Sequence, residues 1–128
     1  MGLGRSKCWL VWDKRNGTTG FSDAEIAWSN LPRAVRMFRW RWNGFLQEDM
    51  ANRETKIHPT QKPVPLMEWC IGLSYRPGSI LDPFAGSCST LVAAKRQGVF
   101  SVGIEADPDM CCKAAARLKE TPLQPPCK

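Results

Sequence analysis

The sequence predicts an α/β fold, and three observations in its second half lead to that prediction. A short apolar run at residues 79–82 is followed by a loop of small residues and a helical pattern from Thr90 to about Gln97. A second apolar run, at residues 99–105, ends in an acid, and residues 107–120 again have a helical pattern. Strands that alternate with helices in this order form βαβ units, whose strands are parallel and whose crossover is right-handed.

The start of the chain predicts an antiparallel pair of strands. CWLVWDK at residues 8–14 is short, aromatic and apolar, and EIAWSN at residues 25–30 can return beside it. The segment RNGTTG at residues 15–20 supplies an Asn-Gly turn and a further glycine. We therefore expect a hairpin with a loop somewhat longer than a tight turn.

Residues 31–47 combine basic and aromatic side chains. Three of the arginines would share one face of a helix, whereas the sequence RWRW alternates as a strand does, so helix and strand both stay open. The arginines are Arg33, Arg36, Arg39 and Arg41, and the aromatic residues between and after them are Phe38, Trp40 and Trp42. The polar residues 48–57 predict a loop.

The middle of the chain predicts an extended connection and then a helix. Residues 58–65, HPTQKPVP, contain three prolines, which favour extended backbone. Residues 66–75 place apolar side chains at positions 66, 69, 70 and 73, a helical spacing. Further on, Gly98 is expected to end the helix that starts near Thr90, and Asp107 to cap the helix that follows it.

These elements predict one domain with three parts. Residues 1–57 form a basic and aromatic N-terminal region, residues 58–120 hold the βαβ unit, and residues 121–128 form a tail. A chain of 128 residues with 43% hydrophobic side chains can bury one modest core. Residues 76–79 are expected to form a turn.

Charge and cysteine content narrow the function classes. The net charge is +6, and residues 1–62 carry 11 Lys and Arg against 6 Asp and Glu, which slightly favours a nucleic-acid partner over a surface that is basic only for solubility. The six cysteines include no CxxC pair and there is one histidine, so we expect reduced cytosolic thiols and no metal site. No apolar run approaches the roughly 20 residues of a membrane span, and we expect a cytoplasmic protein without a membrane partner.

Three residues mark a candidate ligand site at the carboxyl ends of the two parallel strands, where α/β proteins bind ligands. Asp82 ends the first strand, Gly86 lets the backbone approach a ligand, and Glu105 ends the second strand. An acid in that place typically accepts hydrogen bonds from ribose hydroxyls. The alternative is that Asp82 caps the following turn and Glu105 is a solvated strand end, and the residues themselves leave both interpretations open.

HPTQKP, then ILDPFAGSCST, then VGIEADP with AAARL resemble the DNA amino-methyltransferases, in the class whose cofactor motifs follow the catalytic ones. LVWDKRNG, EIAWSN and RWNGFL resemble phage-borne members of that family. The resemblance implies a Rossmann-like S-adenosylmethionine-dependent methyltransferase fold. It also implies site-specific methylation of N6 of adenine or N4 of cytosine in double-stranded DNA, as in restriction-modification.

The resemblance also implies which residues bind. Thr60 and Gln61 would hydrogen-bond the carboxylate of the cofactor, Lys62 would add charge complementarity and Glu105 would hold the ribose. Phe84 would lie near the cofactor, or equally serve as a core aromatic. The full set implied for the cofactor is His58, Thr60, Gln61, Lys62, Asp82, Pro83, Phe84, Gly86, Ser87 and Glu105. For DNA the implied set is Arg33, Arg36, Arg39, Arg41 and Trp40, with core packing as the alternative for the aromatic residues.

Two departures from the family pattern stand out. The loop has Cys88 where the family has glycine, so we expect backbone strain or a blocked pocket. The catalytic Asp-Pro-Pro-Tyr tetrapeptide is absent, so no catalytic residue is predicted and the fold is expected to be incomplete, with exposed strand edges.

Three interpretations follow from the incomplete pattern. The first is a C-terminal fragment or split half that works with a catalytic-half polypeptide. The second is a truncated, non-catalytic protein that binds a cofactor, DNA or a new partner. The third is an enzyme that completes its sheet with a second copy of itself.

Overall fold

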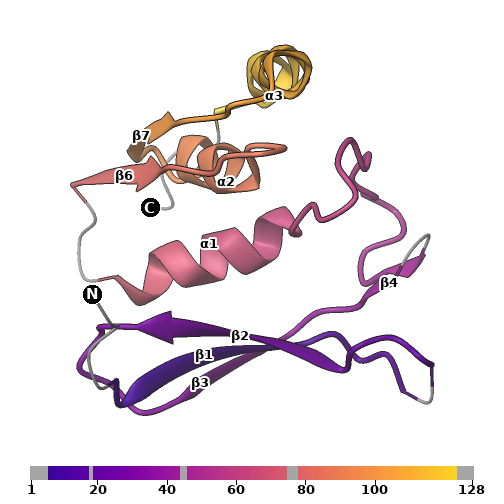
Figure 1. Cartoon of the computed structure of the whole chain (residues 1–128), viewed down its shortest axis with the longest axis vertical. Coiled ribbons are helices and arrows are strands. Elements are labelled where there is room, and N and C mark those ends of the chain that lie inside the picture. The colour runs from indigo at the N-terminus through magenta and orange to yellow at the C-terminus, as the bar shows by residue number, and fades with distance from the viewer. Residues whose placement is uncertain (1–5, 18, 44–45, 75–77, 124–128) are drawn as a thin grey trace. The chain divides into compact units, whose positions relative to one another are not determined.

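The computed structural model describes residues 6–17, 19–43, 46–74 and 78–123 (Figure 1). The chain divides into two compact units, residues 1–53 (unit 1) and residues 54–128 (unit 2). Most of the expected tail, and residues 76 and 77 of the turn expected at residues 76–79, lie outside the described residues. The three-part division expected from the sequence, with its boundary after residue 57, stays a prediction.

Unit 1 contains a three-stranded sheet in the order β2-β1-β3. β1 (Cys8–Asp13) pairs antiparallel with β2 (Ala24–Ser29), with Cys8 opposite Ser29 and Asp13 opposite Ala24. The predicted hairpin is therefore confirmed.

β3 (Arg36–Arg39) answers the question that the sequence left open, because the basic and aromatic segment is a strand and not a helix. It lies parallel to β1 along the edge opposite β2, with Trp12 beside Phe38. β2 ends beside the start of β1, so residues 30–35 bring the chain across to that edge. A short antiparallel pair, β4 (Trp42–Asn43) and β5 (Leu46–Gln47), follows.

Unit 2 contains the predicted βαβ unit. α1 (Val64–Leu73) is followed by β6 (Ser79–Asp82), α2 (Ser89–Arg96), β7 (Phe100–Gly103) and α3 (Pro108–Glu120). β6 and β7 are parallel and lie side by side (Figure 1), which confirms the predicted strand direction.

Local sequence explains where these helices begin and end. Gly98 follows α2 with a φ of +68°, a conformation that glycine adopts without steric cost. The carboxylate of Asp107 accepts hydrogen bonds from the backbone N–H groups of Asp109 and Met110, and Pro108 occupies the first position of α3. Both ends were predicted correctly.

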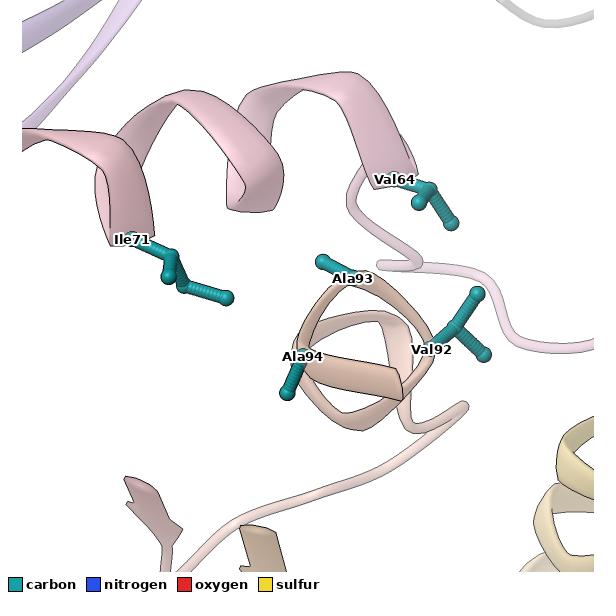
Figure 2. Packing of buried hydrophobic residues seen from close by; sticks show 5 residues of the cluster. All are labelled: Val64, Ile71, Val92, Ala93 and Ala94. Atoms are coloured by element: carbon teal, nitrogen blue, oxygen red, sulfur yellow. The ribbon is translucent and has the colours of Figure 1, made fainter. Parts of the chain in front are cut away.

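The core of unit 2 lies between α1 and α2. Val64 and Ile71 of α1 point toward α2, where Val92, Ala93 and Ala94 are buried (Figure 2). The predicted helix is confirmed, but the side that packs on α2 carries positions 64, 67 and 71 rather than 66, 69, 70 and 73. Since α1 is apolar around most of its circumference, with Glu68 as its one charged residue, hydrophobic spacing cannot select one face.

The β6–β7 sheet has one packed face and one exposed apolar face. On the packed face, Ile80 contacts the α1–α2 core and Gly103 lies so close to Leu91 that a Cβ at Gly103 would come within 2.8 Å of it. Leu81, Phe100 and Val102 share the opposite face by strand register and are 64%, 70% and 45% exposed. Parallel strands are normally covered on both faces.

Candidate functional site

The loop between β6 and α2 contains two residues with positive φ. Gly86 has a φ of +51°, and Cys88 adopts the left-handed conformation at φ +60° and ψ +30°, directly before α2. For a residue with a Cβ this conformation costs roughly 1–2 kcal/mol. The strain expected from the glycine-to-cysteine departure is therefore present.

The Cys88 side chain does not block the site. It is buried in a small cluster with Ala85, Leu91 and Ala114, and it is not among the residues that line the neighbouring cavity. Burial raises the pKa of this thiol.

A cavity of about 210 Å³ lies where the loop meets the segment that precedes α1. Eight of the ten residues predicted for the cofactor line it: His58, Thr60, Gln61, Lys62, Asp82, Phe84, Gly86 and Ser87. Pro83 and Glu105 do not line it, whereas Met67, Ala85, Ser89 and Thr90 do. Ser89 and Thr90 end the motif ILDPFAGSCST, and that position was the one sequence signal available for them.

Side-chain bonds hold the two lining segments together. The Ser89 hydroxyl donates to the Lys62 carbonyl at 2.6 Å, and the Thr90 hydroxyl donates to the Met67 sulfur at 3.4 Å. The cavity is therefore bounded by two segments that α1 separates in the sequence.

The segment at residues 55–61 is organised from within. The buried Gln61 side chain accepts from the Ile57 N–H at 3.0 Å and donates to the Thr55 carbonyl at 3.2 Å. His58 Nδ1 accepts from the Thr60 N–H at 3.2 Å. Gln61 thus shapes this segment, while the Thr60 side chain is exposed.

Glu105 holds the loop from the end of the second strand. One carboxylate oxygen accepts from the Gly86 N–H at 2.7 Å, and the other accepts from the Asp107 N–H at 2.9 Å. The N–H groups of Asp107 and then Gly86 lower the pKa of Glu105. Because a carboxylate can accept about four hydrogen bonds, Glu105 keeps some capacity to accept from a ligand.

Two alternatives that the sequence left open concern Asp82, which also lines the cavity, and Phe84. The Asp82 carboxylate accepts from the Phe84 N–H at 3.1 Å, so it does cap the turn that follows β6. Phe84 is 90% exposed, so the interpretation of this residue as a core aromatic is wrong.

In unit 1, the arginines predicted for DNA are all exposed. Arg36 and Arg39 project to opposite faces because they stand three positions apart on a strand, so the shared face that a helix would give is absent. Arg39 also contacts Asp13 at 3.3 Å.

Trp40 is engaged within unit 1. Its ring stacks on Phe38 with centroids 5.9 Å apart, and its carbonyl accepts from the indole N–H of Trp12 at 2.9 Å. This arrangement supports the packing interpretation for Phe38 and Trp40.

The described residues contain neither a candidate metal site nor a helix that could span a membrane. Within residues 6–17, 19–43, 46–74 and 78–123, no group of three or more His, Cys, Asp or Glu side chains is placed to hold a metal ion. The five cysteines in those ranges are free thiols, and burial raises the pKa of Cys70 to about 11; Cys127 lies outside them. None of the helices just described has the length and apolar character to cross a membrane.

A larger hollow of about 470 Å³ borders α3 and is lined partly by Glu54, Arg96 and Arg117. Those three side chains already form ion pairs, so their charges are less available to a ligand. The larger volume therefore does not make this hollow the better candidate for a ligand site.

The amino-acid sequence is similar to those of known DNA methyltransferases. The family model described as DNA methylase, of the N6/N4 type, matches residues 7–116. The type II methyltransferase M2.DpnII of Streptococcus pneumoniae is 43% identical over 79 residues, which are 61% of this chain and 29% of that protein. M2.LlaDCHI of Lactococcus lactis subsp. cremoris is 39% identical over 80 residues, which are 62% of this chain and 29% of that protein. This chain therefore spans less than a third of the length of either relative.

A solved structure, that of M1.HpyAVI in complex with SAM, superposes with a TM-score of 0.59 at 24% identity. The match covers 85% of this chain and 60% of that one. It confirms the predicted Rossmann-like methyltransferase fold, and the partial coverage of that chain agrees with the fold being incomplete. With a family model that extends over most of its length, the chain belongs to the N6/N4 DNA methylase family.

Proposed function

We propose that unit 2 binds S-adenosylmethionine and acts as the cofactor half of a DNA amino-methyltransferase. The observation that carries the proposal is the 210 Å³ cavity, because it collects two separate sequence motifs into one site. The structure of M1.HpyAVI, which is a complex with SAM, supports the same cofactor for this fold.

The lining residues suit the chemical groups of this cofactor. When bound, S-adenosylmethionine supplies a methyl group on a positively charged sulfur. Thr60 and Lys62 offer a hydroxyl and a positive charge to the carboxylate of the cofactor. Asp82 offers a negative charge to its positively charged groups. Glu105, which already holds the Gly86 N–H, has lone pairs left for ribose hydroxyls.

The size of the cavity suits part of the cofactor only. Ligand clefts in proteins usually begin at about 300 Å³, and this one measures about 210 Å³. We therefore propose that the remaining wall comes from residues outside unit 2.

Methyl transfer needs a catalytic segment that the printed sequence does not contain, since Asp-Pro-Pro-Tyr and its variants are absent. The exposed face formed by Leu81, Phe100 and Val102 supports a missing layer beside the β6–β7 sheet. A catalytic-half polypeptide would cover this face and supply the target-base contacts.

Double-stranded DNA is the proposed substrate of the assembled enzyme. The exposed arginines 33, 36, 39 and 41 support contacts with backbone phosphates in unit 1. Whether adenine or cytosine is methylated follows from the catalytic half. The phage origin, the restriction-modification role and the cytoplasmic location stay predictions.

The same exposed face favours a second candidate, a protein that pairs with its own copy. A solution mass of two chains that falls to one chain in Leu81→Lys would support that candidate. A single-chain mass, with DNA methylation that appears only after mixing with a polypeptide carrying Asp-Pro-Pro-Tyr, would support the split enzyme.

The cofactor proposal is tested by calorimetric titration of S-adenosylmethionine into the purified full chain. Binding is expected for the natural sequence and a loss of binding for Glu105→Ala. The matched control is Glu120→Ala, an exposed acid at the end of α3 that does not line the cavity. Equal binding by all three proteins would contradict the site, and no binding by the natural sequence would contradict the proposed function.

A further inference from the structure

Arg117 of α3, in the AAARL motif, is a partly buried residue whose guanidinium contacts the candidate site. One guanidinium nitrogen donates to the Ser87 carbonyl at 2.7 Å and to the Ser89 hydroxyl at 3.1 Å. The other donates to the Glu54 carboxylate at 2.7 Å. Its side chain is only 16% exposed.

The contacts of Arg117 extend to both walls of the cavity. Glu54 also accepts from the Val64 N–H at 2.8 Å, at the first residue of α1. Ser89 also donates to the Lys62 carbonyl at 2.6 Å. One guanidinium therefore connects the cofactor loop, the segment before α1 and the starts of two helices.

The bond to Ser87 acts on the strained residue of the loop. The Ser87 carbonyl belongs to the peptide group that joins Ser87 to Cys88, and the orientation of this group about the N–Cα bond of Cys88 is the φ angle of +60°. Since a residue with a Cβ disfavours that angle, a buried donor fixed on the carbonyl opposes relaxation of the loop.

We propose that Arg117 is a positioning residue that sets cofactor affinity by holding Cys88 in the left-handed conformation. This inference rests on the proposed cofactor site and deepens it. A glycine at position 88 would adopt the same angle freely, so it would need the guanidinium much less. The arginine and the cysteine are therefore energetically coupled.

Glu54 must be considered in the design of the test. The ion pair is partly desolvated, since each of its side chains is 16% exposed, and this burial raises the pKa of Glu54 and lowers that of Arg117. Removing the guanidinium alone leaves a buried carboxylate, so a general loss of stability is expected together with any effect on the loop. The test must separate the two effects.

The experiment measures S-adenosylmethionine affinity in a cycle of four proteins: the natural sequence, Arg117→Met, Cys88→Gly and the double variant. Arg117→Met is expected to weaken binding by about tenfold, the order of the strain in one left-handed residue. The double variant is expected to bind within about threefold of Cys88→Gly alone. Arg117→Lys keeps the charge but has no planar fork, so its affinity should lie between those of the natural sequence and Arg117→Met.

The matched control is Arg96→Met. Arg96 is also partly buried, and its hydrogen bond and ion pair go to Glu68 at 3.4 Å rather than to the described residues of the loop, so its loss should leave affinity within about twofold. If Arg117→Met binds as the natural sequence does, or loses as much affinity in the glycine background as in the cysteine background, the proposal is wrong.

Hydrogen exchange of the Cys88 amide, which donates to the Ala85 carbonyl at 2.7 Å, separates this inference from the proposed function. In the absence of ligand, the Cys88 amide should exchange at least about tenfold faster in Arg117→Met than in the natural sequence. When position 88 is glycine, replacing Arg117 should no longer change the exchange rate. If the natural sequence binds no cofactor, the proposed function fails, and the exchange rates alone then decide the role of Arg117. Unchanged exchange would overturn it.

Discussion

The two units hold their candidate functional residues in different ways. In unit 2, the loop is held by a hydrogen bond that Glu105 accepts and by hydrogen bonds that Ser89 and Arg117 donate. In unit 1, the arginines are exposed and project to both faces of a strand, and among them Arg39 pairs with Asp13. The first arrangement suits a small ligand that requires fixed geometry, and the second suits a polyanion bound by charge.

The largest effect is expected from a substitution that disturbs the backbone of the loop in unit 2. Gly86→Val places a β-branched residue at a φ of +51° and should cost at least about 1–2 kcal/mol. Cofactor binding should fall by more than about tenfold, because the amide that Glu105 holds moves. Calorimetry gives the affinity and thermal unfolding gives the stability.

Gly72→Ala is the control for that change. Gly72 lies within α1, and a Cβ there would meet nothing within 4 Å. Alanine should leave binding unchanged and stabilise the helix by up to about 1 kcal/mol. Normal binding by Gly86→Val would show that the loop conformation is not what holds the ligand.

DNA binding through unit 1 should instead depend on the salt concentration. If Arg36 and Arg39 contact phosphates, the slope of log affinity for DNA against log salt should decrease in magnitude by about 0.9 for each one replaced by alanine. Fluorescence anisotropy with labelled duplex DNA gives this slope.

Lys113→Ala together with Lys119→Ala, on α3, removes the same charge and should leave the slope as it is. An identical slope in the arginine variant would contradict DNA contact through β3. Cofactor affinity should not change in either variant.

A smaller effect is expected at the contact between the two cavity walls. Ser89→Ala removes the bond to the Lys62 carbonyl and one bond from Arg117, and should weaken cofactor binding about threefold to tenfold. Ser74→Ala, at an exposed position after α1, is the control and should bind normally. Calorimetry on both variants decides the point, and an unchanged affinity in Ser89→Ala would show that the walls need no such contact.

The smallest effect near neutral pH concerns Glu105. Since its pKa in the folded chain is lowered from 4.5, its contribution to stability is complete above that value and is lost as pH falls through the lower folded pKa. The Gly86 amide should therefore be protected from hydrogen exchange at neutral pH and should lose this protection in acid. Glu105→Gln should show little of this pH dependence.

The contribution of Glu54 to stability depends on pH with the opposite sign. Burial raises its pKa, so the folded state favours its protonated form and this contribution to stability increases as pH falls through the raised pKa. Comparing Glu105→Gln with Glu54→Gln separates the two effects. Protection of the Gly86 amide that stays constant into strong acid would contradict the role given to Glu105.

Local signals in the sequence predicted much of unit 2. The Asp107 cap, the glycine after α2 and the short apolar runs each act within a few residues, and all of them have the predicted structure. The cavity residues followed from two motifs and a family resemblance, and eight of those ten residues lie together.

What the sequence missed depends on contacts between distant residues. The strand character of residues 36–39 comes from pairing with β1, and the packed side of α1 comes from the position of α2. Arg117 and Met67 were not predicted for the site. Arg117 lies in the AAARL motif, but its role depends on contacts with residues 30 and 63 positions away.

The central claim is that the segments at residues 58–62 and 82–90 form one cofactor site. It is tested most directly by adding S-adenosylmethionine to the isotope-labelled full chain and following backbone amide resonances. We predict shifts concentrated in those two segments and at Glu105, with little change in β1–β3. Absence of shifts, or shifts centred on the larger hollow beside α3, would contradict the claim.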